Sequence, residues 1–141
     1  MSETKPLPLA DPPAGSKRRV FVVDDHPLMR QSIIGALERE RDLIVCGHAE
    51  DVPEALAAIA SLLPDLVLTD LQLKSSSGLD LIKNLREKLP ALPVIATTMF
   101  DVRRNERLAR AAGAVDFAAK QDGPERLMST VHNVLRTGRK T

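Results

Sequence analysis

Five short apolar segments recur along the chain, separated by stretches with a different pattern. They cover residues 20–23, 43–46, 66–69, 94–97 and 115–119. Each segment is mostly apolar throughout rather than alternating, which is typical of strands buried on both faces of a parallel sheet. The pattern therefore predicts five short, buried strands.

The stretches between the apolar segments carry apolar residues three or four positions apart, which predicts amphipathic helices. The repeating positions are Met29, Ile33 and Leu37; Leu56, Ile59 and Leu63; Leu79, Ile82, Leu85 and Leu89; and Leu127, Val131 and Val134. The stretch 102–112 is rich in charge, so we expect that helix to pack lightly. Pro27 and Pro124 suit first helical turns, and Gly113 suits a helix end.

Strands that alternate with helices predict an α/β fold with a doubly wound, five-stranded parallel sheet and right-handed crossovers. In such sheets ligands bind outside the carboxyl ends of the strands, at the point where the strand order reverses. The residues that follow each strand are therefore the candidates for a functional site.

The chain has 141 residues, a formal net charge of +1 and one cysteine. This length fits one domain at residues 17–137, with a flexible Pro-rich leader at 1–16 and a tail or truncated linker at 138–141. A near-zero charge gives no footprint for nucleic acid, and no apolar run is long enough to span a membrane. A lone cysteine excludes an internal disulfide, so we expect a cytoplasmic protein.

Polar residues follow four of the five predicted strands. Asp24 and Asp25 follow the first strand, Asp70 the third, Thr98 the fourth and Lys120 the fifth. Taken singly, an aspartate after a strand is more often a helix cap or a turn residue. Complementary polar groups at four strand ends are harder to explain by turns, and they predict one functional site.

Three carboxylates so close together would repel one another unless a cation joins them. Lys120 can offset one negative charge, and a divalent ion can offset the rest. Oxygen ligands without a nearby histidine or cysteine favour Mg²⁺. A bound Mg²⁺ beside a carboxylate, an ammonium and a hydroxyl suits phosphoryl transfer, with an aspartyl phosphate as the product.

These motifs resemble the receiver domain of two-component response regulators over residues 18–137. The matching positions are the acidic pair Asp24 and Asp25, the phospho-acceptor Asp70, and Gly78, Thr98, Phe117 and Lys120. The resemblance implies the flavodoxin-like (βα)5 topology with strand order 2-1-3-4-5. The stretches 23–28 and 97–99, with no proline after Lys120, are similar to the subgroup usually joined to a helix-turn-helix DNA-binding domain.

The resemblance also implies a metal site. Asp25, Asp70 and the backbone carbonyl of Gln72 would ligate Mg²⁺, and Asp24 would act through water.

By the same resemblance, Lys120 would pair with the phosphoryl oxygens. Thr98 would donate to the phosphoryl group, and Phe117 would turn into the space that Thr98 vacates. The change would reshape the face formed by the fourth helix, the fifth strand and the fifth helix, as a shift between two populations.

The expected function is to accept a phosphoryl group from a sensor histidine kinase or a phosphotransfer protein and so to control an output, with transcription favoured. No enzyme activity is expected beyond self-phosphorylation and self-dephosphorylation. DNA would be reached only through a C-terminal domain absent from this chain, no membrane partner is expected, and a homodimer is one option.

Three alternatives remain open. The first is a degenerate receiver that serves only as an interaction module, because Lys74 replaces the proline usual four residues after the acceptor. The second is an aspartate-nucleophile phosphatase, although Gln72 stands where such enzymes place their general acid. The third is a flavin or nucleotide carrier, but the acidic loop after the first strand would repel phosphate. His26, in that loop, is expected to have a surface role.

Overall fold

The computed structural model describes residues 16–137, so the expected tail and all of the expected leader except Ser16 lie outside the described residues. The strands are β1 (Arg18–Val23), β2 (Leu43–Ala49), β3 (Leu66–Asp70), β4 (Val94–Thr98) and β5 (Asp116–Ala119). The α-helices are α1 (Pro27–Glu38), α2 (Val52–Leu62), α3 (Gly78–Lys88), α4 (Val102–Ala112) and α5 (Pro124–Thr137), and a 3₁₀ turn, η1 (Lys120–Asp122), links β5 to α5.

The five strands form one parallel sheet in the order β2-β1-β3-β4-β5, which confirms the expected topology. Val23 at the end of β1 lies beside Thr69 of β3. Asp70 in turn lies beside Thr97, and Thr98 lies beside Ala119 at the end of β5. The carboxyl ends of four strands therefore meet at one edge of the sheet, and this register positions the site.

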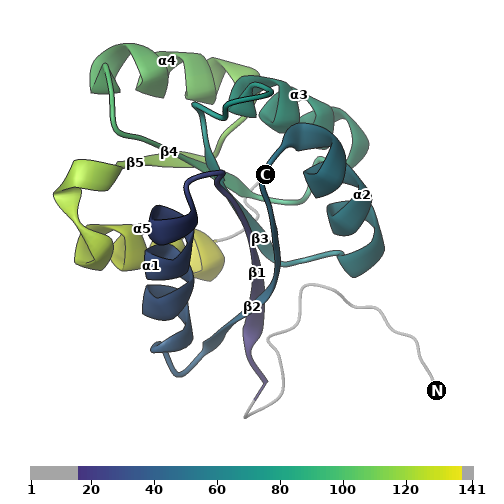
Figure 1. The fold of residues 1–141 in the computed structure, drawn as a ribbon. Coiled ribbons are helices and arrows are strands. Elements are labelled where there is room, and N and C mark those ends of the chain that lie inside the picture. The colour runs from purple at the N-terminus through teal and green to yellow at the C-terminus, as the bar shows by residue number, and fades with distance from the viewer. Residues whose placement is uncertain (1–15, 138–141) are drawn as a thin grey trace.

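Helices cover both faces of the sheet (Figure 1). Because successive side chains of a strand point to opposite faces, β1 contributes to two separate cores. Val20 and Val22 pack with residues of α1 and α5, whereas Phe21 and Val23 pack with residues of α2, α3 and α4. Burying apolar surface in both cores drives the association of the layers.

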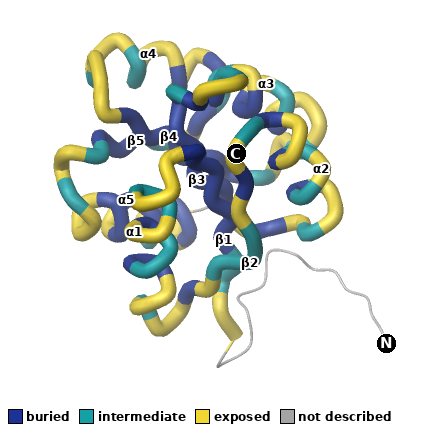
Figure 2. The backbone as a smooth tube through the Cα atoms, in the orientation of Figure 1, coloured by how far each residue is buried: buried dark blue, intermediate teal, exposed yellow. Residues whose placement is uncertain are grey.

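The sheet interior is buried, and the outer sides of the helices are exposed (Figure 2). Every residue of β3 and β4 is buried, as the continuous apolar runs predicted. The prediction is wrong for β2, where five of seven positions are exposed or partly exposed, including Ile44 at 41%. The reason is that β2 forms an edge of the sheet and has a neighbouring strand on one side only.

Two helices show how the sequence pattern translates into packing. The apolar repeat of α2 was expected to include Leu63, but the helix ends at Leu62 and Leu63 adopts a left-handed conformation (φ 48°) with 60% of its surface exposed. In α4, Ala109 and Ala112 are the buried residues, which confirms that this helix packs lightly. Gly113 ends α4 at φ 126°, a conformation that favours glycine.

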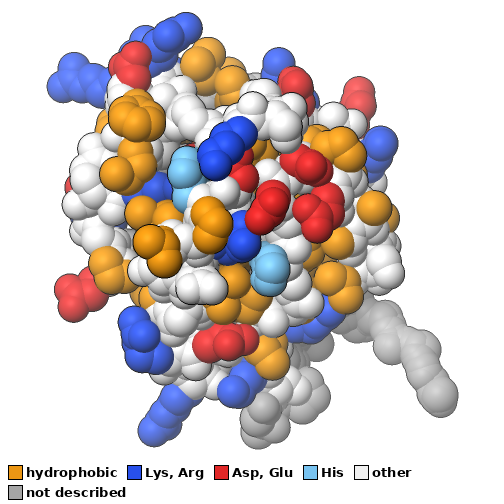
Figure 3. Space-filling view, in the orientation of Figure 1, with side chains coloured by type: hydrophobic (Ala, Val, Ile, Leu, Met, Phe, Trp, Pro, Cys, Tyr) orange, Lys and Arg blue, Asp and Glu red, His pale blue; other side chains and the backbone are white. Residues whose placement is uncertain are grey.

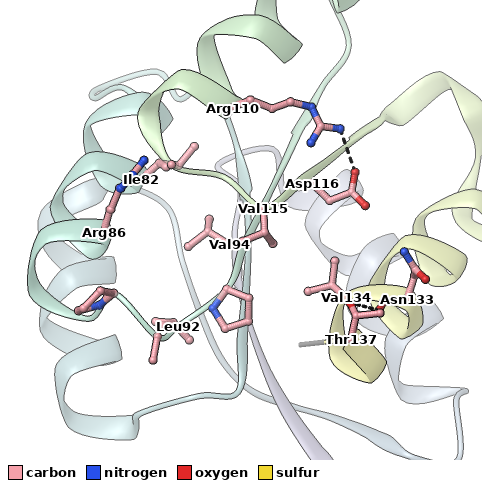
Figure 4. Close-up of a pocket in the computed structure, with 14 residues that line it drawn as sticks. Ile82, Arg86, Leu92, Val94, Arg110, Val115, Asp116, Asn133, Val134 and Thr137 are labelled. Carbon is pink, nitrogen blue, oxygen red and sulfur yellow. Dashed lines mark hydrogen bonds and ion pairs between the residues drawn. The ribbon is translucent and has the colours of Figure 1, made fainter. Parts of the chain in front are cut away.

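A groove lies at the edge of the sheet where β4 and β5 begin, lined by residues such as Arg86, Val94 and Val115 (Figure 4). Arg110 and Asp116 form an ion pair of 3.2 Å beside it. The residues that line this groove include none of the predicted site residues. Between residues 16 and 137, no helix is both long and apolar enough to cross a bilayer.

Candidate phospho-acceptor site

Three aspartates converge at the carboxyl edge of the sheet. Asp24 and Asp25 directly follow β1, and Asp70 is the last residue of β3. Their exposed fractions are 1%, 8% and 3%, respectively, so all three carboxyl groups are buried. The side-by-side pairing of β1 and β3 brings these residues together, as the sequence predicted.

Lys120 provides the cation of this cluster. Its Nζ atom donates to Asp24 Oδ2 at 2.7 Å and to Asp70 Oδ2 at 3.2 Å, and 4% of its side chain is exposed. Because β4 separates β5 from β3 in the sheet, a long side chain is needed to reach Asp70 from the end of β5. The predicted Lys120–Asp70 juxtaposition is therefore present, with Asp24 as a second partner.

The environment of Asp70 disfavours its charged form. Burial raises the pKa of Asp70 above its ordinary value, and the like charge of Asp24 adds to this effect. The Lys120 ammonium and the hydrogen bond from the Gln72 backbone N–H to Asp70 Oδ1 (3.2 Å) act in the opposite direction without cancelling it. More positive charge at this site would stabilise the ionised Asp70.

Within residues 16–137, one oxygen of Asp25 has no hydrogen-bond partner. Its Oδ2 accepts a hydrogen bond from the backbone N–H of Lys74, whereas its buried Oδ1 accepts none. Buried polar atoms are rarely left unpaired, and each one calls for a physical explanation. Asp24, Asp25, His26 and Asp70 each offer one ligand atom to a group whose members lie within 4.8 Å of one another, so the donor set fits a bound cation.

His26 lies much closer to the carboxylates than the sequence suggested. Its Nδ1 atom is 2.9 Å from Asp24 Oδ1, 3.2 Å from Asp25 Oδ1 and 3.6 Å from Asp70 Oδ2. The expectation that no histidine stands near the acidic cluster is therefore wrong. Half of the His26 side chain is exposed, so its surface position is confirmed while its ring also faces the site.

Lys74 affects the site through its backbone. The side chain of Lys74 is exposed, as expected for a polar loop, but its N–H donates to Asp25. A proline at this position has no N–H and could not make this bond. The departure from the usual residue therefore adds a contact between the β3–α3 loop and the acidic pair.

Thr98 is buried and hydrogen-bonded. Its hydroxyl donates to the side-chain carbonyl of Gln72, and it also accepts from the backbone N–H of Phe100 at 3.3 Å. Asn105, in the first turn of α4, donates to the Phe100 carbonyl at 2.7 Å and lies 3.5 Å from the Thr98 hydroxyl. Asn105 and the Gln72 side chain were not predicted from the sequence, because only the folded loops bring these amides to the hydroxyl.

Three further residues near the site have defined places: Phe117, Phe100 and Gln72. Phe117, in β5, is half-buried and packs against the core between the sheet and α2, α3 and α4. Phe100 is 66% exposed, and its backbone takes part in the Thr98 network. Gln72 contributes its N–H and its side chain to the site, and the metal role of its carbonyl stays a prediction.

Carboxylates, a lysine and a hydroxyl, all buried at one edge of the sheet, form a site suited to an anion bound through a cation. The face of the molecule drawn in Figure 3 has acidic side chains gathered near its middle, with basic and histidine side chains beside them. Asp24 and Asp70 are almost fully buried, so little of either side chain reaches the molecular surface.

Comparison with known proteins places this geometry in a family. Residues 20–132 match the family model of the response regulator receiver domain. The receiver domain of the putative response regulator NarL from Mycobacterium tuberculosis superposes with a TM-score of 0.79 at 30% identity, over 86% of this chain and 98% of that one.

Longer curated relatives match the chain over part of their length. The uncharacterized transcriptional regulatory protein YxjL of Bacillus subtilis (strain 168) is 30% identical over 120 residues, which are 85% of this chain and 55% of that protein. A protein-glutamate methylesterase/protein-glutamine glutaminase of Pyrococcus abyssi is 34% identical over 111 residues, or 77% of this chain and 30% of that protein. The chain spans about half or less of these relatives, and it belongs to the response regulator receiver domain family.

Proposed function

We propose that Asp70 accepts a phosphoryl group from a sensor histidine kinase or a phosphotransfer protein in a Mg²⁺-dependent reaction. The observation that carries the proposal is the position of Asp70, which is buried and lies in contact with the Lys120 ammonium, beside the acidic pair that follows β1. Lys120 would pair with the oxygens of the incoming phosphoryl group, which would otherwise meet three carboxylates.

The transfer step is a substitution at phosphorus. A carboxylate oxygen of Asp70 forms the new O–P bond, and the bond from phosphorus to the donor breaks with its electron pair on the donor. When the donor is a phosphohistidine, the released ring nitrogen takes up a proton and the product is neutral imidazole. When the donor is acetyl phosphate, the leaving group is acetate. Lys120 stabilises the charge on the transferring oxygens, because its ammonium is fixed beside Asp70.

Asp25 and Asp70 are the residues that would hold Mg²⁺, with the Gln72 backbone carbonyl as a third ligand and Asp24 acting through water. The support is Asp25 Oδ1, a buried oxygen to which no group in the described part of the chain donates a hydrogen bond. When bound, Mg²⁺ supplies positive charge that offsets the carboxylates and the phosphoryl oxygens.

The output would be a change in the face formed by α4, β5 and α5. Thr98 would exchange its bond to Gln72 for one to the phosphoryl group, and Phe117 would move into the vacated space. Transcription is the favoured output, because the relative YxjL is named as a transcriptional regulatory protein. DNA would then be contacted by a part of the protein other than this domain. The domain itself would act on no substrate other than its own phosphoryl group, would work in the cytoplasm, and could pair with a second copy through this face.

Labelling tests the acceptor. Incubation with acetyl phosphate and Mg²⁺ should add one phosphoryl mass in intact-protein mass spectrometry, and Asp70→Asn should abolish the addition. Asp80→Asn, which changes an exposed aspartate in the first turn of α3, is the matched control and should label fully. Equal labelling of the Asp70→Asn variant would refute the assignment.

Titration tests the metal site. Mg²⁺ should shift the amide resonances of residues 24, 25, 70 and 72, and Asp25→Ala should remove this response. An unchanged titration of the Asp25→Ala variant would count against Asp25 as a ligand.

A degenerate receiver that acts only as an interaction module is the second candidate. The observation in its favour is the Lys74 N–H that occupies Asp25 Oδ2, because a carboxylate oxygen held by the loop is less available to a metal. Lys74→Pro separates the two functions. If wild type takes up no phosphoryl group and Lys74→Pro does, the loop has silenced the site.

A further inference from the structure

We propose that His26 is a nitrogen ligand of the acidic site and that it makes the site select first-row transition-metal ions over Mg²⁺. The inference rests on the proposed function, because the same carboxylates would hold Mg²⁺. It assigns a role to a side chain that the phosphoryl-transfer scheme does not use.

The first argument is the position of the ring nitrogen. Nδ1 lies 2.9 Å, 3.2 Å and 3.6 Å from oxygens of Asp24, Asp25 and Asp70, respectively. Two ligands about 2.1 Å from one metal ion, at right angles, are about 3 Å apart. The ring nitrogen and the three carboxylates are therefore spaced as ligands of a common ion are.

The second argument is the unpaired oxygen of Asp25. Asp25 Oδ1 is buried and accepts no hydrogen bond from any described residue, although His26 Nδ1 is 3.2 Å away. At this distance the two atoms are close without forming an aligned hydrogen bond. A shared cation would satisfy both atoms at once, which a proton on the ring does not do for Oδ1.

The local backbone holds His26 at the site. The residue precedes α1, with Pro27 in the first helical turn, and its backbone N–H donates to Asp24 Oδ1 at 2.9 Å. The contacts of its ring in the described structure all go to the three aspartates. Because half of the side chain is exposed, an ion can reach the ring from solvent.

The chemistry of the ligand atoms then determines which ions bind more tightly. Mg²⁺ is a hard ion that prefers oxygen ligands and keeps several waters, so an imidazole adds little to its binding. Imidazole suits Ni²⁺, Cu²⁺ and Zn²⁺, and affinities for mixed nitrogen and oxygen sites rise along the first row to Cu²⁺ before falling at Zn²⁺. His26 therefore strengthens the binding of transition-metal ions at this site and has little effect on the binding of Mg²⁺.

A second histidine–carboxylate group provides an internal control. His132 Nε2 lies 3.0 Å from Asp42 Oδ1 and 3.6 Å from Glu40 Oε1. These carboxylates are exposed or partly exposed, and neither contributes a buried oxygen without a partner. Surface binding of a transition-metal ion would depend on His132, whereas binding at the proposed site would depend on His26.

Calorimetric titration with MgCl₂ and with NiCl₂ tests the proposal on wild type, His26→Ala, His26→Asn and His132→Ala. Asn is informative because its side-chain oxygen replaces the ring nitrogen at nearly the same reach. We expect His26→Ala and His26→Asn to weaken Ni²⁺ binding at least about tenfold and to change Mg²⁺ binding less than about threefold. His132→Ala should leave both affinities as in wild type.

The outcomes separate this inference from the proposed function. If Ni²⁺ affinity survives both His26 changes, or falls only in His132→Ala, His26 is not a ligand. If Mg²⁺ and Ni²⁺ weaken equally, the ring acts on the carboxylates rather than on the metal, and the proposal also fails. A wild type that binds Ni²⁺ through His26 but binds no Mg²⁺ would uphold the inference and refute the Mg²⁺ part of the proposed function. Far-ultraviolet circular dichroism of each variant confirms that the domain is folded during the titration.

Discussion

The hydroxyl of Thr98 donates its hydrogen to the side-chain carbonyl of Gln72, two residues beyond Asp70. Thr98 is fully buried, and its hydroxyl also accepts a hydrogen bond from the Phe100 N–H. A hydroxyl has a single hydrogen to donate, so a bond from Thr98 to a phosphoryl oxygen must replace the bond to Gln72. Gln72 therefore competes with the phosphoryl group for the predicted switch residue.

Gln72→Met should strengthen the response to beryllofluoride, a stable phosphoryl mimic. The substitution removes the competing carbonyl while keeping the length of the side chain. A hydrogen bond contributes about 0.5–1.5 kcal/mol net, so we expect about a two- to tenfold gain in apparent affinity. Amide shifts of residues 98–119, followed during titration with beryllofluoride and Mg²⁺, measure the effect.

Gln121→Met is the control for Gln72→Met. Gln121 is exposed in η1, so the variant carries the same Gln-to-Met substitution at a position outside the Thr98 hydrogen-bond network. Its titration should match wild type. A Gln72→Met variant that binds beryllofluoride more weakly than wild type would show that Gln72 assists the site instead of competing with it.

Thr98→Ala should separate phosphorylation from the conformational change. The variant keeps Asp70, Lys120 and the acidic pair, so it should still accept a phosphoryl group. It lacks the hydroxyl, so amide shifts of residues 103–119 should lose most of their response to beryllofluoride. Thr97→Ala is the control, because the Thr97 hydroxyl contacts the Thr69 carbonyl at 3.4 Å and not the switch network. A full response in Thr98→Ala would place the signal on another route.

Asp70→Asn should stabilise the domain at neutral pH when no divalent ion is present. Burial and the nearby Asp24 raise the pKa of Asp70 above 3.8, despite Lys120. In the pH range between 3.8 and the raised value, the folded state binds more protons than the unfolded state. The free energy of unfolding therefore falls as pH rises through this range. An uncharged Asn avoids that loss.

Urea unfolding in the presence of EDTA measures this effect. The advantage of Asp70→Asn over wild type should grow between pH 4 and pH 7, and Asp80→Asn should show no such trend. A variant that is less stable than wild type at pH 7 would mean that the Lys120–Asp70 contact outweighs the burial of charge.

Local patterns in the sequence sufficed for the strands, the helices and the acidic convergence. Short apolar runs identified β3 and β4, and the polar residues at their ends identified Asp70 and Thr98. These predictions succeeded because burial and register depend on residue type at fixed spacing. The strand order required the resemblance to a known family, since periodicity does not say which strands are neighbours.

The sequence could not supply contacts that depend on loop conformation. The ring of His26 turns toward the carboxylates because its backbone bonds to Asp24, and no spacing rule predicts that. Asn105 reaches the Thr98 network from the next helix. Leu63 fits the apolar repeat of α2, yet the chain turns out of the helix there before Pro64, which could not continue it.

Gly78→Ala should distort the site by displacing the backbone that carries Asp70. Gly78 begins α3, and a Cβ there would lie 2.2 Å from the Asp70 carbonyl oxygen and 2.8 Å from Leu71 Cα. Both atoms belong to the backbone, so the β3–α3 loop must shift and carry Asp70 with it. Such overpacking costs about 1–3 kcal/mol, and we expect slower labelling of Asp70 by acetyl phosphate together with that loss of stability.

Gly35→Ala is the matched control for Gly78→Ala, because both glycines are helical. A Cβ at Gly35 meets nothing closer than Arg39 Nη1 at 3.7 Å, an ordinary contact. Alanine is favoured over glycine inside a helix by about 0.5–1 kcal/mol, so Gly35→Ala should stabilise the domain and leave labelling unchanged. Urea unfolding and the rate of phosphoryl uptake measure both variants. If Gly78→Ala behaved like Gly35→Ala, the close approach of α3 to the Asp70 backbone would not constrain the site.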